Sequence, residues 1–417
     1  HLRTTRIMGH AGTDFEIEWR SVEELMAVEA TDPLLRSAEI ALASGLYTKE
    51  TLLAKYEAIR SKCFAAADEA DRRPKLVTLE EVVAPLAPYT PDKVAAEAVR
   101  ADYAAQREKV FGGAERLPEK QAPRHLAIQI NNALHDLFCK YPEALLFGED
   151  VAQKGGVYTV TKGLFKNFSG RRVFNTLLDE TMILGLAQGY ANMGMLPLPE
   201  IQYLAYFHNA CDQIRGEACS LQFFSNGQYS NPMVMRIASL GYQRGFGGHF
   251  HNDNSITALR DIPSLVVGCP SRGDDAATML RTLTALAKVD GRVCAFLEPI
   301  ALYMTKDLYE AGDGQWLTNY PPPDQAMPLG EERVYVPEAR DLVIFTFGNG
   351  VPMSLRAARE IEKTRGWKVR VVDLRWLQPL NTDAIVRHAG ECARILVVDE
   401  GRRGADAGPG QHRGLGQ

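Results

Sequence analysis

From residue 122 onward, short apolar stretches of strand length alternate with segments of helical length. The apolar stretches read "ALLF", "RRVFNT", "PLPEIQY", "PMVMRIAS", "PSLVVG" and "RVCAFLEP". Strands that are buried on both faces have such continuous apolar runs, and a helix between consecutive strands makes the strands parallel. The pattern therefore predicts an α/β domain whose parallel sheet is covered on both faces.

Two further regions flank this domain. The Pro- and Gly-rich stretch "DGQWLTNYPPPDQAMPLGEE" is typical of an interdomain linker, and "DLVIFTFG", "WKVRVVDLRW" and "ARILVVDE" then predict a smaller α/β unit. The N-terminal part carries helix signals instead, such as the capping box "SVEE". We expect the glycine-rich end, "GRRGADAGPGQHRGLGQ", to be disordered. The expected parts are a helical tail and linker at 1–121, an α/β domain at 122–312, a linker at 313–337 and a smaller α/β domain at 338–417.

Charge and cysteine content narrow the functional class. The net charge of -5 lacks the basic excess that nucleic-acid-binding and membrane-surface proteins normally have. The seven cysteines are odd in number and contain no CxxC motif, which indicates reduced thiols rather than a disulfide framework or a zinc site. No apolar run approaches the roughly 18 residues that span a bilayer. We therefore expect a cytoplasmic protein, although a chain that starts without Met says little about targeting signals.

Acidic residues follow the first predicted strands of the larger domain. Glu149 and Asp150 come after "ALLF", Asp179 and Glu180 come after "RRVFNT", and Glu200 lies within "PLPEIQY". Functional groups collect at the carboxyl ends of parallel strands, so these acids are candidates for chemistry. Asp179 alone is explained as the cap of the helix that follows. Capping does not explain Glu180, which stands at the first position of an apolar helix.

Other features allow both a structural and a functional explanation. Gly185 and Gly189 lie on one helix face, which suggests close approach of another backbone, although ordinary tight packing suffices. In "GYQRGFGGHFHNDNS", the alternation of His249 and His251 could bind a metal, but no third ligand has a motif, so we expect no metal site in this chain. A proton donor on a loop over a cleft is the favoured explanation. Tyr206 is either a core residue or a ring that faces a planar ligand.

Several ordered motifs closely resemble the β half of the thiamine-diphosphate-dependent E1 component of 2-oxo acid dehydrogenase complexes, in the transketolase superfamily. They are "LLFGEDVAQKGGVYTVTKGLF", "LLDETMILGLAQGYANMG", "PEIQYLAYFHNACDQI", "HFHNDNS" and "FLEPIALY". The sequences "EIQYLAYF" and "FLEPIALY" are more similar to E1 subunits of the branched-chain type than to those of the pyruvate type. "DLRWLQPLN" and "ILVVDEGRR" resemble the C-terminal domain of the same subunits, so the resemblance covers about 122–403.

The N-terminal residues resemble the other E1 subunit. "TRIMGHAGTDFEIEWRSVEEL" and "TDPLLRSAEIALASGLYTKETLL" are similar to the tail of the α subunit, so the chain resembles an α–β fusion joined near 88–122. Ala11 stands where animal enzymes carry a regulatory serine, which excludes phosphorylation at that position. Nothing in the chain resembles the domain of the α half that carries the diphosphate–magnesium motif, and the glycine-rich end does not resemble the family. We therefore expect the chain to need a diphosphate-binding half from an upstream segment or another chain.

The resemblance implies roles for three residues of the larger domain that would face the cofactor. Glu180 matches the catalytic glutamate, which hydrogen-bonds the aminopyrimidine ring of thiamine diphosphate and so favours loss of the thiazolium C2 proton. Tyr206 matches the aromatic residue that packs on the pyrimidine. Glu149 matches an acid that lies between paired active sites.

Three further residues receive roles in the same way. His251 matches the histidine that assists acyl transfer to the lipoyl group of E2. His10 matches a loop histidine of the α half that reaches the active site, and Arg6 matches a nearby loop arginine. These assignments imply that both halves of the chain contribute to one site.

The resemblance implies oxidative decarboxylation of a 2-oxo acid, branched-chain or pyruvate, with acyl transfer to the lipoyl domain of E2. The implied cofactors are thiamine diphosphate, Mg²⁺ held by a domain outside this chain, and K⁺, which is common in such β halves. The implied assembly is a dimer or an α2β2-like complex, without nucleic acid or membrane. Two alternatives stay open: a transketolase-like transferase that shares Glu180, and a catalytically incomplete fragment that serves dimerisation or E2 docking.

Overall fold

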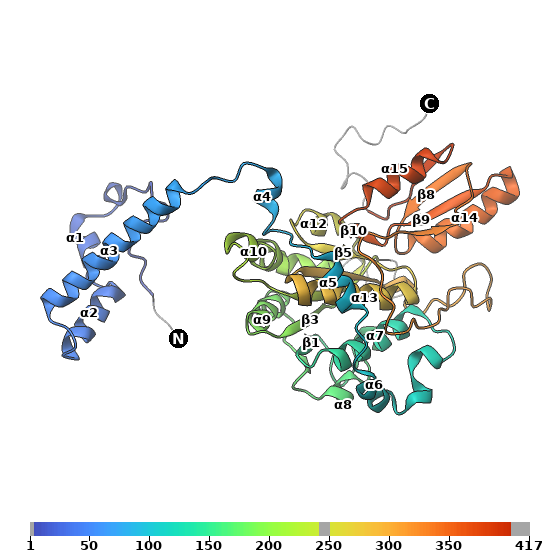
Figure 1. The fold of residues 1–417 in the computed structure, drawn as a ribbon, viewed down its shortest axis with the longest axis horizontal. Coiled ribbons are helices and arrows are strands. Elements are labelled where there is room, and N and C mark those ends of the chain that lie inside the picture. Colours follow the sequence, from blue (N-terminus) through green and yellow to red (C-terminus); the bar gives the residue numbers. More distant parts are fainter. Residues whose placement is uncertain (1–3, 242–250, 402–417) are drawn as a thin grey trace. The chain divides into compact units, whose positions relative to one another are not determined.

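The computed structural model describes residues 4–241 and 251–401. The chain divides into two compact units, of which the first ends at Thr78 and the second begins at Leu79 (Figure 1). Each unit is considered by itself. Within the described residues, no helix combines the length and the apolar character that a membrane crossing requires.

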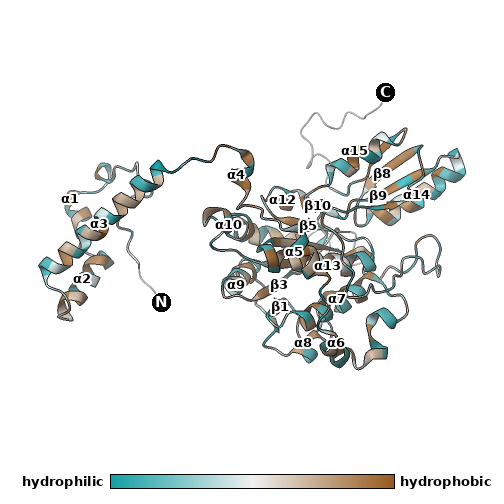
Figure 2. Cartoon of the chain, in the orientation of Figure 1, coloured by the Kyte–Doolittle hydropathy of each residue, from teal (hydrophilic) through white to brown (hydrophobic). Residues whose placement is uncertain are grey.

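The first unit consists of short helices and one long helix. They are η1 (Glu16–Glu18), α1 (Val22–Glu29), α2 (Pro33–Ala43) and α3 (Lys49–Arg72). Ser21 and Glu24 form the predicted capping box at the start of α1. None of the residues in these helices is buried, and apolar side chains such as Leu53 and Ile59 are exposed. Figure 2 shows hydrophobic and hydrophilic residues interspersed along these helices. A groove of about 760 Å³ runs between α2 and α3. This unit therefore lacks a core of its own.

The larger sheet of the second unit confirms the predicted parallel α/β domain. Its seven strands have the order β10-β5-β6-β4-β3-β1-β2. The strands are β1 (Ala144–Gly148), β2 (Val173–Asn175), β3 (Leu196–Ile201), β4 (Met233–Ser239), β5 (Val266–Gly268), β6 (Val293–Pro299) and β10 (Trp376–Gln378). All neighbours pair in parallel except β10, which runs antiparallel to β5. The parallel strands place their carboxyl ends along one edge.

Both faces of this sheet are covered. Leu146 of β1 joins a core with α7 (Leu126–Lys140) and α13 (Gly273–Asp290), whereas Phe147 joins a second core with α9 (Glu180–Asn192). The shorter helices are α4 (Leu79–Val83), α5 (Pro91–Ala98), α6 (Ala104–Phe111), η2 (Ala114–Arg116), η3 (Pro118–Lys120), η4 (Val157–Thr159), α8 (Leu164–Phe168), α12 (Ile256–Arg260) and η7 (Ile300–Leu302). Because α5 packs on α13 and α6 packs on α7, residues 91–111 belong structurally with the sheet.

One predicted helix is divided in the structure. The segment between "PLPEIQY" and "PMVMRIAS" predicts a single helix over 207–224, but the chain forms a 3₁₀ helix η5 (Leu204–Ala210), a π-helix η6 (Gln213–Ala218) and α10 (Leu221–Phe224). The buried residues of η5 are Leu204, Phe207 and Ala210. Their spacing of three matches the three residues per turn of a 3₁₀ helix, so burial against the sheet selects this tighter winding.

The C-terminal sheet is smaller, as predicted. Its order is β11-β8-β9-β7, with β7 (Arg333–Tyr335), β8 (Leu342–Thr346), β9 (Val369–Asp373) and β11 (Ile395–Val397). The helices α14 (Gly350–Arg365) and α15 (Thr382–Gly390) accompany it. Of the end that is expected to be disordered, 401–417, all but Gly401 lies outside the described residues.

Candidate active site

The candidate site lies at the carboxyl edge of the larger sheet. Glu149 directly follows β1, and Glu180 begins α9 after β2. A side chain at Gly148 would place its Cβ 2.8 Å from the carbonyl oxygen of Glu200. Gly148 also has a φ of 156°. Glycine therefore lets the end of β1 approach β3, and the chain leaves the sheet with Glu149 beside the other acids.

Glu180 is held at the start of α9. Asp179 is the N-cap, as predicted, and its carboxylate accepts a hydrogen bond of 3.1 Å from the amide of Met182. Only 7% of Glu180 is exposed, and its Oε2 accepts a hydrogen bond of 3.2 Å from Nδ2 of Asn209. Within the described residues, no lysine, arginine or histidine lies within ion-pair distance of Glu180. The carboxylate therefore depends on the helix N-terminus and one amide for stabilisation.

Glu149 is the second buried acid of this edge, with 8% exposed. Burial raises its pKa to about 7, and the negative charges of Glu180, Asp150 and Glu200 act in the same direction. A carboxyl with a pKa in this range gains and loses a proton near neutral pH, as a general acid or base must.

Glu200 lies deeper in the sheet and has a different environment. Nη1 of Arg236 donates to its Oε2 at 2.6 Å, and Nε of Arg236 lies 2.7 Å from Oε1 of Glu298. Tyr303 donates its hydroxyl to Glu298 at 2.6 Å. Sequence reasoning missed this network of Arg236, Glu298 and Tyr303. The available signal was a charge within the apolar strands "MVMRIAS" and "CAFLEP".

The structure brings Tyr206 and His251 together. Their ring centroids are 5.7 Å apart, and the imidazole lies 4.5 Å from the ring of Tyr203 with the planes nearly perpendicular. Tyr206 lies on η5, as does Asn209, which bonds Glu180. The 3₁₀ helix η5 therefore links the acid cluster to the aromatic group around His251. His249 lies outside the described residues.

Two predicted site residues belong to the first unit. Arg6 and His10 are both exposed there. Their proposed approach to the active site stays a prediction. For metal binding, residues 4–241 and 251–401 contain no group of three or more His, Cys, Asp or Glu side chains that could hold an ion.

The glycines of α9 face open space. A Cβ added at Gly185 or Gly189 would meet no described atom within 4 Å. Tight packing within this domain therefore does not explain them. The neighbouring Leu177 and Leu178 are 71% and 82% exposed. Exposed apolar residues thus precede Glu180 in the chain, and small residues lie on an open face of the helix that Glu180 begins.

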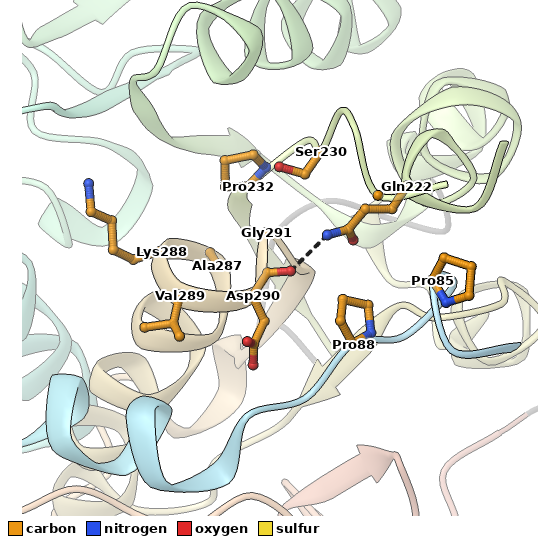
Figure 3. Close-up of a pocket in the computed structure, with 11 residues that line it drawn as sticks. Pro85, Pro88, Gln222, Ser230, Pro232, Ala287, Lys288, Val289, Asp290 and Gly291 are labelled. Carbon is orange, nitrogen blue, oxygen red and sulfur yellow. Dashed lines mark hydrogen bonds between the residues drawn. The ribbon is translucent and has the colours of Figure 1, made fainter. Parts of the chain in front are cut away.

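A pocket of about 370 Å³ lies at the opposite, amino edge of the sheet (Figure 3). Thr90 anchors the incoming segment there by donating its amide and hydroxyl to the Asp290 carboxylate at 2.9 and 2.5 Å. Gln222 donates to the carbonyl of Asp290 at 2.8 Å (Figure 3). The carboxylate and the carbonyl of Asp290 are thus hydrogen-bonded within the protein. This indicates that Asp290 anchors the segment around Thr90 rather than binding a ligand.

Comparison with known proteins assigns the family. The family model "Transketolase, pyrimidine binding domain" matches residues 123–306, and "Transketolase, C-terminal domain" matches residues 332–409. The 3-methyl-2-oxobutanoate dehydrogenase subunit beta of Mycobacterium tuberculosis is 33% identical over 282 residues, which cover 67% of this chain and 76% of the relative. The chain belongs to the E1 β-subunit family of 2-oxo acid dehydrogenases, in the transketolase superfamily.

Other relatives of this E1 β-type chain agree. The pyruvate dehydrogenase E1 component subunit beta of Staphylococcus aureus is 34% identical over 284 residues, covering 67% of this chain and 80% of the relative. A solved structure titled as a split gene transketolase, an inactive beta4 tetramer, has a TM-score of 0.51 at 19% identity and covers 67% of this chain and 79% of that one. That likeness supports the fold. Because both family models begin after residue 122, the α-type tail stays a prediction.

Domains of this E1 β type imply dependence on thiamine diphosphate, and the residues at the carboxyl edge suit the cofactor's aminopyrimidine end. Glu180 is a buried carboxyl without a cationic partner, so it can bond a ring nitrogen. The half-buried ring of Tyr206, on the adjoining η5, can pack on a planar heterocycle. The acidic side chains at this edge would repel the cofactor's diphosphate. The described residues of this edge therefore do not form a diphosphate site.

Proposed function

We propose that this chain is the β-type part of an E1 enzyme that decarboxylates a 2-oxo acid oxidatively and transfers the acyl group to a lipoyl domain of E2. The single observation that carries the proposal is Glu180, a buried carboxyl at the start of α9 without a positive partner among the described residues. A structural acid in that position would be paired or exposed. A carboxyl that binds a cofactor ring is expected to be buried and to have no ion-pair partner in the protein.

The chain's own groups have distinct tasks in this proposal. Thiamine diphosphate, when bound, supplies a thiazolium that accommodates the negative charge left by loss of carbon dioxide. Glu180 orients the aminopyrimidine ring by a hydrogen bond to a ring nitrogen and holds or releases a proton at its carboxyl. Tyr206 packs on the same ring. Glu149 exchanges a proton near neutral pH, since its pKa is raised to about 7 by burial and by the neighbouring carboxylates.

His251 serves the second half of the reaction in this proposal. Its imidazole is half-buried against Tyr203 and Tyr206, so its position is constrained by two rings. When one sulfur of the lipoyl disulfide takes the acyl group, the S–S bond breaks and the other sulfur leaves as a thiolate, to which an imidazole can donate a proton near neutral pH. We propose that His10 and Arg6 reach the same site from the α-type tail.

A second half must complete the site. The triplet GDG at 312–314 lies at the start of the linker, and its Asp313 carboxylate accepts hydrogen bonds from backbone amides of the same loop. The family models match a pyrimidine-binding and a C-terminal domain, so we propose that another segment or chain binds the diphosphate and Mg²⁺. The exposed Leu177 and Leu178 and the open face of Gly185 and Gly189 support a partner beside Glu180. We further propose an α2β2-like or dimeric assembly, and K⁺ bound to backbone carbonyls.

The test supplies the chain with a diphosphate-binding E1 half, thiamine diphosphate and magnesium. Reduction of an artificial electron acceptor is followed with 2-oxoisovalerate, pyruvate and 2-oxoglutarate in turn. We expect activity with one of the first two acids and none in Glu180→Gln. Cofactor binding without activity on any 2-oxo acid would favour a transferase, which an assay with a ketose donor and an aldose acceptor would detect. No cofactor binding would favour a non-catalytic role.

The role of His251 needs a separate assay. His251→Ala should slow reductive acylation of an added lipoyl domain about 100-fold while decarboxylation with the artificial acceptor falls less than about threefold, because general acid–base groups contribute factors of this size. Equal losses in both assays would contradict its assigned step.

A further inference from the structure

We propose that Asn349, in the smaller α/β domain, is a positioning residue that holds the chain around His251 in place for acyl transfer. The inference rests on the proposed function, in which His251 serves the acyl-transfer step. It extends the site to the smaller domain, none of whose residues received a role from the sequence.

Asn349 stands at the N-cap position of α14, but within the described residues its side chain makes no capping bond. Its Nδ2 donates instead to the carbonyl oxygen of Leu240 at 2.9 Å and to Oε2 of Glu400 at 3.1 Å. Both partners are acceptors, so the amide nitrogen is the atom that faces them. Only 5% of Asn349 is exposed. Helix capping, the usual role of an asparagine at this position, therefore does not explain Asn349.

Leu240 is the residue that directly follows β4, on the way along the chain to His251. It is buried and has a φ of 59°, which a leucine rarely adopts. Such a backbone conformation persists only where the surrounding structure holds it. A Cβ added at Gly348 would lie 2.4 Å from Cδ1 of Leu240, so glycine lets the two chains come close enough for the bond from Asn349. The smaller domain thus fixes the direction in which the chain leaves β4.

Residues 251–254 are held at the same place. Nδ2 of Asn254 donates to the backbone carbonyl of Glu400 at 3.0 Å. A Cβ added at Gly241 would meet Oδ1 of Asn254 at 3.3 Å, so the chain directly after β4 and residues 251–254 lie side by side. Asn349 and Glu400, which are bonded to each other, therefore restrain the chain both before and after the residues 242–250 that lie outside the described ranges.

The same stretch of chain also contacts η5. His251 meets two tyrosine rings there, and Oδ2 of Asp253 lies 3.4 Å from Nε2 of His208. The side chain of His208 is 49% exposed, and exposed ion pairs contribute little to stability. The buried bond from Asn349 to Leu240 is therefore the stronger restraint on where His251 lies.

The first test measures how accessible the imidazole of His251 is in the full chain without cofactor. Diethyl pyrocarbonate modifies accessible imidazoles, and peptide mass spectrometry gives the rate at each histidine. Asn349→Leu keeps the size of the side chain but removes the donor. We expect the rate at His251 to rise about tenfold in this variant, because loss of a buried hydrogen bond shifts a local opening equilibrium by about this factor. The rate at the exposed His10 should stay unchanged, and an unchanged rate at His251 would overturn the inference.

Asn381→Leu is the matched control. Asn381 is the N-cap of α15 in the same domain, and its Nδ2 donates to the carbonyl of Gly330 at 2.9 Å. This variant should leave the labelling of His251 unchanged even where it lowers the free energy of unfolding. An equal rise in Asn381→Leu would show general loosening of the domain and would overturn the inference. Should circular dichroism show that Asn349→Leu does not fold, Asn254→Ala decides in its place, with a rise at His251 expected and an unchanged rate contradicting the inference.

The second test measures both half-reactions of the chain supplied with the diphosphate-binding half. Asn349→Leu should slow reductive acylation of a lipoyl domain about tenfold, whereas decarboxylation with the artificial acceptor should fall less than about threefold. In a His251→Ala background the same substitution should cause no further loss of acylation, because Asn349 acts through His251. A further loss in that background, or equal losses in both half-reactions, would overturn the inference.

The two tests distinguish failure of the inference from failure of the proposed function. If the wild type is inactive with every 2-oxo acid, the proposed function fails, while the labelling still decides whether Asn349 holds His251 in place. If the wild type is active and Asn349→Leu leaves acylation unchanged, the inference fails alone.

Discussion

The second unit contains two pairs of buried carboxyls, and only one of the two pairs has a positively charged partner. At the sheet edge, Glu149 and Glu180 are 8% and 7% exposed, and Glu180 has no positive partner among the described residues. Inside the sheet, Glu200 and Glu298 are 7% and 1% exposed and share Arg236. Burial alone therefore does not mark a reactive acid in this fold. The absence of a counter-charge separates the edge pair from the interior pair.

The difference follows from where each set lies. Arg236 is the register partner of Glu200, so the interior charges compensate each other across adjacent strands. The edge acids lie on connections beyond the strands, where no neighbouring strand can supply an arginine. An uncompensated acid at an edge is costly for stability but leaves its lone pairs available to a ligand.

The largest expected effect is on the edge pair. Glu180→Gln should lower turnover about a thousandfold, which corresponds to about 4 kcal/mol in the activation free energy. It should not lower the free energy of unfolding, since glutamine preserves the size and the bond from Asn209 and removes an uncompensated buried acid. Turnover and urea denaturation measure the two quantities. Glu217→Gln, at an exposed acid, is the control, and near-normal turnover in Glu180→Gln would remove the distinction between the two sets.

The interior pair should respond in stability instead. Arg236→Met leaves Glu200 and Glu298 buried without their cation, so urea denaturation should show a loss of about 3–5 kcal/mol. Arg359→Met is the matched control, because its ion pair with Glu310 is exposed and is worth less than about 1 kcal/mol. Similar small losses in both variants would mean that the interior charges are not interdependent.

A smaller effect distinguishes capping from chemistry in adjacent residues. Asp179→Ala removes the acceptor for the amide of Met182 and should cost about 1 kcal/mol of unfolding free energy. Asp179→Asn keeps an acceptor and should recover most of that loss. Thermal and urea denaturation of both variants measure these changes in the free energy of unfolding. If alanine and asparagine are equally destabilising, charge rather than capping is the contribution of Asp179.

A further effect on stability depends on pH. The pKa of Glu149 is raised from 4.5 to about 7 in the folded chain, so folding is penalised where the unfolded carboxyl is ionised and the folded one is not. The penalty is absent below pH 4.5, grows between pH 4.5 and 7, and is then constant. Glu149→Gln should therefore gain stability relative to wild type by roughly 1 kcal/mol for each pH unit of this window. A constant difference between pH 5 and pH 8 would contradict the raised pKa.

Local sequence was sufficient to predict the strands of the larger sheet and two helix N-caps. The alternation from residue 122 predicted six strands that the larger sheet contains, and the capping signals at Ser21 and Asp179 are realised as expected. Sequence did not predict η5, because its winding depends on which residues meet the sheet. It also placed the stretch containing Trp376 in the smaller unit, whereas β10 pairs with β5 of the larger sheet. Strand partners far apart in sequence leave no local signal.

The sequence by itself determined the fold class, the acids at the strand ends and the candidate role of Glu180, because periodicity, capping and motif order are local properties. Tertiary structure alone decided which carboxyls are compensated, that Asn209 reaches Glu180, and that Tyr206 meets His251. Those contacts join residues that are 29 and 45 positions apart. The energy of a buried charge is set by neighbours across the sheet, which only the folded chain brings within bonding distance.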